Sequence, residues 1–523
     1  MPFARNRRRW SPLGVALVTL AACGGRVSAI GGSSGNGAVS SGGGNSSESS
    51  GATLVTASGT VVASSGTVAA SGTIENASGT VIAGSGTVIS TSGTVISTSG
   101  TDSEASAGFG RDAALDAAPN EDNGMPSTSY PAPHAPLPQM VNARGGPVLL
   151  TPHVYLIFYP DTANQSALET FAQAVSTSTY WATRSSEYGV GALTYAGTTV
   201  LTGQPSPTTI TSTQIQSWIG QEIAQGVFGT PDPQAIYTVV YPSTTTIQQP
   251  NPVSPLFGPV DSCSTFSAYH DNVSVALSDG GAPTTFAYAV IATCVSSIDD
   301  QTPSMSHEWI EASTDPQATA SGAFTLSGGP NAAYFSVDSD DVVWAVLSSG
   351  GEAADLCQPE GAAADYTPND IGYAVQRIWS NALAAASHDP CAPDLAGQPF
   401  FDSAPVLDET VTFSSELTGT ITTKGVTIAL GTSATIEVDL FSDAATSGPW
   451  TVTADDLLSR DYSSYGIEPS LSFQWDRTQG SNGEKLHLTI SVTGPSIVGG
   501  AHAFVVTSTL GNRSYQWPGI VVE

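Results

Sequence analysis

The N-terminal part of this 523-residue chain contains almost no residues that can build a hydrophobic core. From Gly24 to about Leu137 the composition is dominated by Gly, Ser, Thr, Ala and Val, which is typical of a linker. Such a segment buries too little apolar surface to offset the entropy lost when a backbone is ordered. We therefore expect the large folded domains to lie in residues 138–523.

A phrase of about seven residues recurs inside this tract. The tripeptide SGT begins at residues 58, 65, 71, 78, 85, 92 and 99, and Val or Ile follows it in most copies. The repeat is not a coiled-coil heptad, because each unit contains Gly and β-branched residues that disfavour helix. We interpret residues 23–137 as a disordered stalk that holds a folded head away from a membrane. A short β-solenoid is the alternative.

The N-terminus has the layout of a secretion signal. Four arginines at positions 5, 7, 8 and 9 precede an apolar run, residues 13–22, that is too short to span a membrane. The sequence LAAC at residues 20–23 resembles a bacterial lipobox, which predicts cleavage of residues 1–22 and acylation of Cys23. An ordinary signal peptide with an incidental cysteine is the alternative. Lipidation would make the chain an exported, membrane-anchored lipoprotein of the periplasm or the cell surface.

Charge excludes nucleic acid as a partner. The chain has 14 Lys and Arg against 45 Asp and Glu, a formal charge of -31. Loss of the four signal-peptide arginines leaves 10 against 45, or -35. A surface this acidic repels a phosphate backbone and suits an exported protein with affinity for hard cations.

Cysteine usage agrees with export. Besides Cys23 the chain has four cysteines: Cys263, Cys294, Cys357 and Cys391. An even number in an oxidising compartment predicts disulfides, and three pairings are available. We expect sequence neighbours to pair, 263 with 294 and 357 with 391. A tetrathiolate metal site is the alternative, but no Cys-x-x-Cys spacing supports it.

Residues 138–395 have the pattern of a domain that mixes helices and strands. Apolar, β-branched runs of strand length occur at residues 154–160, 236–242 and 286–294, and amphipathic helical patterns lie between the first two. This order predicts a central sheet with helices packed against it, α/β or α+β. A further helix is expected to open at Thr302-Pro303, to run into the stretch SHEWIEASTDP (residues 306–316) and to end near Thr314.

Three residues on that last helix have the spacing of a metal site. His307 and Glu311 are one turn apart, so both side chains can reach one ion. Glu308 lies about 100° around the helix, where a carboxylate can take a proton from metal-bound water. A surface helix with ordinary salt contacts is the alternative.

Several segments resemble, in consistent order, the phosphate-induced (EXORDIUM-like) family of secreted proteins and its bacterial zincin-like relatives with an HExxE helix. They lie between about residues 145 and 391 and read GGPVLLTPHVYLIFYP, ALETFAQAVSTSTYWATRSSEYGVG, CSTFSAYHD, the apolar strand ending in Cys294, SHEWIEASTDP, EAADLC and VQRIWSN. The resemblance implies a zincin-like α+β fold with a central sheet and an active-site helix. It leaves the substrate open.

The third metal ligand has several candidates. Asp315, eight residues after His307, is the expected one, although a turn before proline explains an aspartate equally well. His270 in the sequence AYHD is the alternative, and a lone histidine is more often a core residue. Glu352 and Asp355 are further acidic candidates. One histidine with two carboxylates is a harder donor set than most catalytic zinc sites have, so we expect zinc with calcium or manganese as alternatives.

From about residue 399 the pattern changes to short β-type runs: VTIAL, ATIEVDL, LSFQW, LHLTISV and AFVVTS. Their spacing predicts that residues 399–523 form an immunoglobulin-like β-sandwich without a buried disulfide. We interpret this domain as an accessory or binding module. Trp450, Trp475 and Trp517 are expected to pack in its core, with a carbohydrate-stacking face as the alternative.

Two functions remain open on the sequence alone. The first is a metal-dependent hydrolase of the peptidase type on the cell surface, acting on a peptide or protein. The second is a non-catalytic adhesion protein, in which the zincin-like domain is a scaffold and the sandwich binds a glycan or another protein. A convincing third ligand would favour the enzyme.

Overall fold

The computed structural model describes residues 124–250, 258–277, 280–318, 329, 331–348, 351–395, 397–415, 419–463, 466–496 and 500–523, and seven strands between residues 55 and 97. Residues 30–121 form one compact unit, and residues 122–523 form another. The signal peptide and Cys23 lie outside the described residues, so export and lipidation stay predictions. No helix in the described part of the chain is long and apolar enough to span a membrane.

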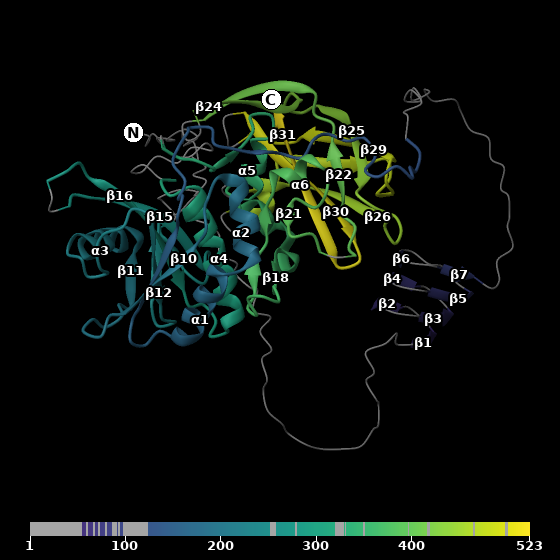
Figure 1. Ribbon diagram of the computed structural model, residues 1–523. Coiled ribbons are helices and arrows are strands. Elements are labelled where there is room, and N and C mark those ends of the chain that lie inside the picture. Colours follow the sequence, from purple (N-terminus) through teal and green to yellow (C-terminus); the bar gives the residue numbers. More distant parts are fainter. Residues whose placement is uncertain are drawn as a thin grey trace, which may run out of the picture. The chain divides into compact units, whose positions relative to one another are not determined.

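Two sheets of parallel strands occur between residues 55 and 97, which is the arrangement of the β-solenoid alternative. The role of residues 23–137 as a stalk stays a prediction. One sheet contains β1 (Val55–Ser58), β3 (Val68–Ser71), β5 (Val81–Ser85) and β7 (Val95–Ser97). The other contains β2 (Val61–Ser65), β4 (Ile74–Ser78) and β6 (Thr91–Ser92) (Figure 1).

The register explains why a core-poor repeat can form strands. Val55 pairs with Val68 and Val68 with Val81, an advance of 13 residues, and Val81 pairs with Val95 after 14. One coil therefore takes up two of the seven-residue phrases. Val and Ile favour extended backbone, and stacked copies satisfy each other's backbone hydrogen bonds without needing a large core.

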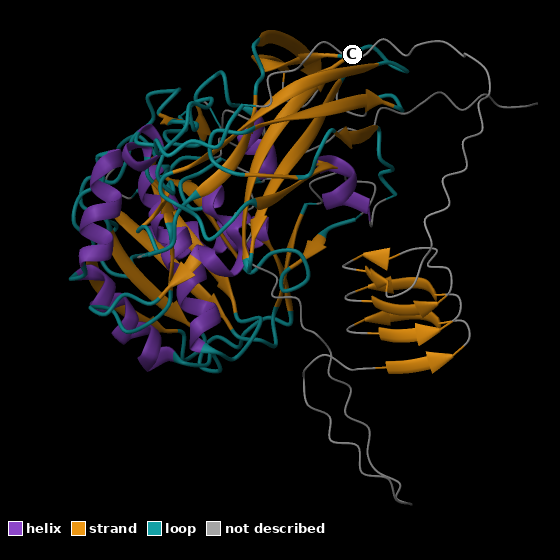
Figure 2. Cartoon of the chain, turned by 90° about the vertical axis from the view of Figure 1, so that its right-hand side faces the viewer, coloured by secondary structure: helices purple, strands orange, loops and turns teal. Residues whose placement is uncertain are grey.

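The head, residues 138–395, contains the predicted central sheet. Its strand order is β10 (Thr194–Val200), β9 (His153–Phe158), β12 (Ala235–Tyr241), β16 (Thr284–Ala292) and β15 (Ala268–Val275). The first four strands are parallel, whereas β15 is an antiparallel edge strand. The sheet is thus mixed, with helices packed on it as expected (Figure 2).

Helices cover both faces of this sheet. Helix α1 (Gln165–Ser176) buries Leu168, Phe171, Ala172 and Val175 in the same core cluster as α4 (Ile298–Thr314). Helix α3 (Ser212–Ala224) buries Ile215, Ile219 and Ile223 in a second cluster on the opposite side. Along β9, an interior strand of the sheet, Leu156 and Phe158 belong to the first cluster and Ile157 to the second, because successive strand residues point to opposite faces.

Shorter elements complete the head. They are β8 (Met140–Val141), α2 (Thr179–Ser185), η1 (Ser186–Tyr188), β11 (Thr209–Thr211), β13 (Thr246–Gln249), β14 (Val260–Asp261), β17 (Ser336–Val337), α5 (Val343–Leu347), η3 (Asp355–Ala364), β18 (Asp365–Tyr366), β19 (Val375–Gln376), β20 (Ile378–Trp379), α6 (Asn381–Ala385) and β21 (Cys391–Ala392). Both expected disulfides are present. Cys263 pairs with Cys294 and Cys357 with Cys391, with Cα atoms 5.0 and 5.6 Å apart. Their presence agrees with an oxidising compartment.

The C-terminal part consists of two sheets. The first contains β22 (Phe401–Pro405), β25 (Ser433–Ser442), β29 (Lys485–Val492) and β27 (Leu471–Trp475). The second contains β23 (Glu409–Ser415), β24 (Gly419–Thr427), β31 (Arg513–Val522), β30 (Ala501–Leu510), β26 (Trp450–Asp456) and β28 (Gln479–Gly480), and α7 (Leu457–Tyr462) follows β26. The sheets pack on each other through Phe401 against Trp450, with ring centroids 5.4 Å apart.

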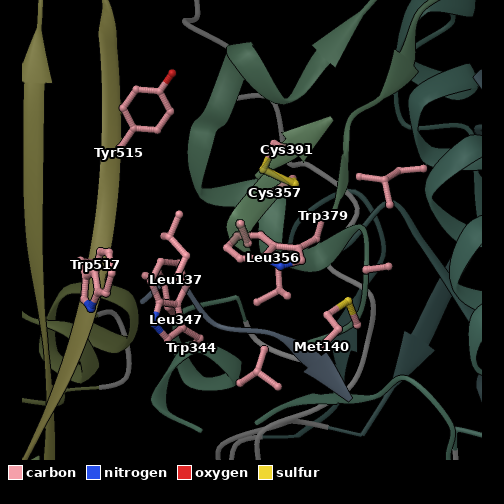
Figure 3. Close-up of a cluster of buried hydrophobic side chains, with 14 of the residues drawn as sticks. Leu137, Met140, Trp344, Leu347, Leu356, Cys357, Trp379, Cys391, Tyr515 and Trp517 are labelled. Atoms are coloured by element: carbon pink, nitrogen blue, oxygen red, sulfur yellow. A yellow bond between two sulfur atoms is a disulfide. The ribbon is translucent and has the colours of Figure 1, made fainter. Parts of the chain in front are cut away.

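The hydrophobic core of these sheets continues into the head. Trp517 of β31 packs edge-on against Trp344 of α5, with ring centroids 5.4 Å apart, and Trp344 packs against Trp379 at 5.6 Å. Figure 3 shows these three rings in one cluster of buried side chains that also contains the Cys357–Cys391 disulfide. Trp450 and Trp517 are both buried, so the core interpretation is confirmed for these two tryptophans. The head and the sheets therefore share one core.

Candidate metal centre

Helix α4 carries the HExxE sequence and begins earlier than expected. It starts at Ile298, where the Ser297 side chain accepts a hydrogen bond from the backbone N–H of Asp299 at 3.2 Å, and Pro303 lies inside the helix. The expected start at Thr302-Pro303 is wrong because Ser297 is the better cap and two aspartates in the first turn favour the positive end of the helix dipole. The expected end at Thr314 is confirmed.

The helix is buried, which rules out the surface-helix alternative. His307, Glu308 and Glu311 are each at most 1% exposed. Trp309 fixes the helix against the sheet, since its indole N–H donates to Thr238 Oγ1 at 2.9 Å and its ring stacks on Phe171. Burying three ionisable residues on one helix is costly unless their charges are compensated.

Gln376 of β19 orients the His307 ring. His307 Nδ1 lies 2.9 Å from Gln376 Oε1, while Gln376 Nε2 donates to the carbonyl of Ala354 at 2.6 Å. The backbone N–H of Gln376 also donates to Ser306 Oγ at 3.0 Å. An amide oxygen can only accept, so Nδ1 carries the proton and Nε2 is directed at the carboxylates. Metal-binding histidines are typically oriented in this way.

Two carboxylates converge on His307 Nε2. Glu311 Oε2 lies 3.0 Å away and Asp355 Oδ1 lies 3.6 Å away. The backbone N–H of Asp355 donates to Glu311 Oε1 at 3.1 Å, which holds the two acidic residues together and leaves Oε2 facing the imidazole. The ligand atoms of His307, Glu311 and Asp355 lie within 4.8 Å of one another.

His270 enters the same site from the edge strand β15. Its Nε2 lies 3.4 Å from Glu352 Oε1, and its Nδ1 lies 3.6 Å from Glu308 Oε2 and 3.7 Å from Glu311 Oε2. The ligand atoms of His270, Glu311 and Glu352 form a second group within 4.8 Å. The structure thus places every candidate metal ligand from the sequence, except Asp315, in one of two groups that share Glu311.

Asp315 lies at the C-terminal cap of α4 and is also buried. Its Oδ1 accepts a hydrogen bond from the backbone N–H of Ala333 at 2.8 Å, and it belongs to neither group of converging ligand atoms. Burial, the largest cause, raises its pKa to about 6. Its role as third ligand stays a prediction, and the geometry favours Asp355.

Glu308 lies between the two histidines without a hydrogen bond. It is completely buried, and neither of its carboxylate oxygens makes a hydrogen bond to any described residue. Its Oε1 lies 4.0 Å from His307 Nε2, and its Oε2 lies 3.6 Å from His270 Nδ1. A carboxylate left in this state is a strong base if it is ionised.

Burial and crowding perturb every ionisable group in the site. Desolvation raises the pKa of Glu308. Desolvation, followed by the charge of the nearby Glu311, raises the pKa values of Glu352 and Asp355 well above their usual range. Desolvation alone would lower the pKa of His307, but Glu311 and Glu308 outweigh it and raise that pKa to about 10. The site therefore needs positive charge, supplied either by protons or by a cation.

A third acidic group in the head is already neutralised. Glu360 and Asp389 form ion pairs with the buried Arg377 at 2.5 and 2.7 Å, and the nearby Cys391 is in a disulfide. This group has no need of a metal ion. The contrast shows that a buried pair of acids in this protein is compensated by a cation where the chain provides one.

Sequence reasoning did not find Gln376, and it named Asp355 and Glu352 only as further candidates. The two acids are three residues apart in EAADLC, a spacing that places both on one side of a helical turn. Gln376 has no such signal in the sequence, because β19 is only two residues long.

Comparisons with known proteins leave the family open. No protein family model matches the chain, and no curated protein matches it. A solved structure, surface layer protein SbsC domains 1–6, aligns with 50% of this chain at 11% identity and a TM-score of 0.14. The alignment spans 36% of that chain's length.

Proposed function

We propose that this protein is an exported, metal-dependent hydrolase of the peptidase type. His307, Glu311 and Asp355 hold a divalent cation, and Glu308 takes the proton from a water molecule that the ion acidifies. Gln376 keeps the His307 ring in the ligand orientation. The proposal takes Asp355 as third ligand in place of Asp315.

The state of Glu308 is the observation that carries the catalytic part of this proposal. In a site that only stores an ion, each buried carboxylate is expected to bind the ion or to accept hydrogen bonds. Glu308 is completely buried, yet both its oxygens lack hydrogen-bond donors and one lies 4.0 Å from the metal-facing nitrogen of His307. That placement suits a general base beside the ion better than a ligand.

The donor set supports a divalent cation of intermediate hardness. One imidazole and two carboxylates bind zinc and also manganese, while calcium prefers oxygen ligands alone. We propose zinc as the physiological ion, with manganese as the first alternative and calcium as the second.

The remaining parts of the chain fit a tethered surface enzyme. The mixed sheet with an antiparallel edge strand beside the site helix supports a zincin-like head, and the two packed C-terminal sheets support an immunoglobulin-like accessory domain. Acylation of Cys23 would anchor the chain, with residues 30–121 between the anchor and the head.

A non-catalytic surface protein is the second candidate, and the burial of the site favours it. His307, Glu311 and Asp355 are at most 1% exposed, as expected for a closed ion site that only stabilises a scaffold. In that case Glu308 would add to ion binding, and the C-terminal sheets would bind a glycan or a protein.

Substitution of Glu308 by glutamine separates the two candidates. Glu308→Gln keeps the size of the side chain but cannot take a proton, so the hydrolase should retain its metal and lose at least 100-fold in cleavage of a fluorogenic casein substrate. His307→Ala should lose the ion held by His307, Glu311 and Asp355, and with it the activity. Metal content is measured by elemental mass spectrometry, and cleavage of the casein substrate is measured on the same samples.

The control is His502→Ala. His502 is a buried histidine of β30, in the C-terminal sheets, and its Nε2 lies 2.9 Å from Glu523 Oε1. This variant should leave metal content and activity unchanged. No cleavage by the metal-loaded wild type, together with loss of metal in Glu308→Gln, would favour the scaffold.

A further inference from the structure

We infer that the centre binds two divalent cations, with Glu311 as their shared carboxylate ligand and with the second ion held by His270, Glu311 and Glu352. This inference rests on the proposed ion at His307 and extends it. The ligand class is a pair of Mn²⁺, Fe²⁺ or Zn²⁺ ions, which accept mixed imidazole and carboxylate donors.

The convergence of ligand atoms is the first argument. Each of the two groups has one histidine, Glu311 and one acid from the segment after α5, and in each group the ligand atoms lie within 4.8 Å of one another. The two histidines never occur in the same group. One ion position therefore does not serve both imidazoles, whereas two ions about 3.5–4 Å apart do.

Glu311 has the geometry of a shared ligand. Its Oε1 is held by the backbone N–H of Asp355, and its Oε2 lies 3.0 Å from His307 Nε2 and 3.7 Å from His270 Nδ1. The two rings reach the same oxygen from different elements, α4 and β15. His307 faces Asp355 through the same Nε2 that faces Glu311, whereas His270 faces Glu352 Oε1 through its other nitrogen, Nε2, at 3.4 Å.

Charge is the second, independent argument. Glu308, Glu311, Glu352 and Asp355 are all at most 1% exposed, so these four carboxylates would place four negative charges beside two imidazoles if all of them were ionised. A single divalent ion neutralises only half of that charge, and buried charge without compensation is strongly unfavourable. Two divalent ions would balance these four carboxylates when both imidazoles are neutral, and the nearby buried Asp315 has the backbone N–H of Ala333 as a donor.

A second ion would also serve the proposed chemistry. Paired ions stabilise both the attacking and the leaving oxygen in hydrolysis. Glu308 lies 4.0 Å from His307 and 3.6 Å from His270, so its carboxylate faces both ion positions. Within this arrangement Glu308 remains the proton acceptor, and Glu311 holds the two ions at a fixed spacing.

Manganese titration of the full-length protein tests the inference. Elemental analysis after removal of free Mn²⁺ should give two ions per chain in the wild type and one in both His270→Ala and His307→Ala. Electron paramagnetic resonance should show an exchange-coupled pair in the wild type and a single-ion spectrum in each variant. His502→Ala should keep two ions.

The outcomes separate this inference from the proposed function. One ion in the wild type, or two ions in His270→Ala, overturns the second site and leaves the ion at His307 intact. No ion in the wild type overturns both. Glu352→Gln, which preserves side-chain size, repeats the test if His270→Ala does not fold, and it should also bind one ion. Zn²⁺ titrations should give the same stoichiometries.

Discussion

At the scale of single residues, this protein tolerates buried charge only with compensation. Arg377 is completely buried and is matched by Glu360 and Asp389. The acids around His307 are grouped with two histidines and with one another, and this difference is what points to cations. Asp402 in β22 is a different case, because burial is the largest cause of its raised pKa and Ser403 and Ser508 are its hydrogen-bond partners.

Asp402 should make the stability of the protein depend on pH. Its backbone neighbour Ser403 donates to Oδ1 at 2.8 Å, but burial outweighs this bond and raises its pKa from 3.8 to about 7. Because the pKa of Asp402 is higher in the folded state than in the unfolded state, the protonated carboxyl contributes to the free energy of unfolding. This contribution is fully present below about pH 4 and is lost as the pH rises through about 7. The ionised form costs roughly 4 kcal/mol as an upper value.

Asp402→Asn removes this cost and keeps an oxygen for the Ser403 N–H. The variant should match the wild type near pH 4.5 and be more stable by several degrees at pH 8. Thermal unfolding between these pH values measures the difference. A difference that does not change with pH would show that Asp402 does not titrate in this range.

At the scale of elements, the two-residue strand β19 has an effect on the site out of proportion to its length. It pairs with β18, and the Tyr180 hydroxyl donates to the carbonyl of Gln376 at 3.0 Å. These contacts hold the Gln376 side chain between His307 and the carbonyl of Ala354. The segment from Ala354 to Asp355 is thereby tied to α4 by both Gln376 and Glu311.

Gln376→Leu should weaken metal binding without unfolding the protein. The leucine leaves His307 Nδ1 without its acceptor, so the ring loses its preferred orientation, and such a change typically lowers metal affinity 10–100-fold. Competition with a chromophoric chelator measures the affinity. Gln249→Leu is the matched control, since Gln249 is buried in β13 and its Oε1 makes no hydrogen bond to the described residues. Equal affinities of both variants would contradict the role of Gln376.

At the scale of the whole molecule, the C-terminal sheets support the metal-binding segment. Trp517 of β31 packs on Trp344 of α5, and α5 directly precedes Glu352 and Asp355 (Figure 3). The Cys357–Cys391 disulfide joins η3 to β21 beside this cluster. A head cut off at residue 395 would expose these rings to water.

Trp517→Ala should therefore destabilise the protein and lower its metal affinity. Truncation of a buried tryptophan typically costs about 3–5 kcal/mol, and the cavity lies under the segment that carries two ligands. Trp475→Ala in β27 is the control, because Trp475 is only partly buried. Unfolding by denaturant and metal titration are compared for both. Equal metal affinities in the two variants would show that the C-terminal sheets do not support the site.

The sequence by itself determined the local and covalent features of this protein. Strand runs, the amphipathic face of α1 and the end of α4 follow from side-chain periodicity and a proline. An even cysteine count predicts two disulfides, and the preference for sequence neighbours selects the observed pairing from three. These properties depend on neighbours along the chain. The one-turn spacing of His307 and Glu311 likewise follows from helix geometry alone.

Only the tertiary structure decided which groups meet. The start of α4 depends on Ser297, and the stacking of the SGT repeat depends on pairing between copies 13 or 14 residues apart. His270, Asp355 and Gln376 reach the acidic and imidazole side chains of α4 from three separate elements, and no pattern along the chain records that convergence. Long-range packing and the compensation of buried charge select those partners, because both depend on distances in space and not on sequence separation.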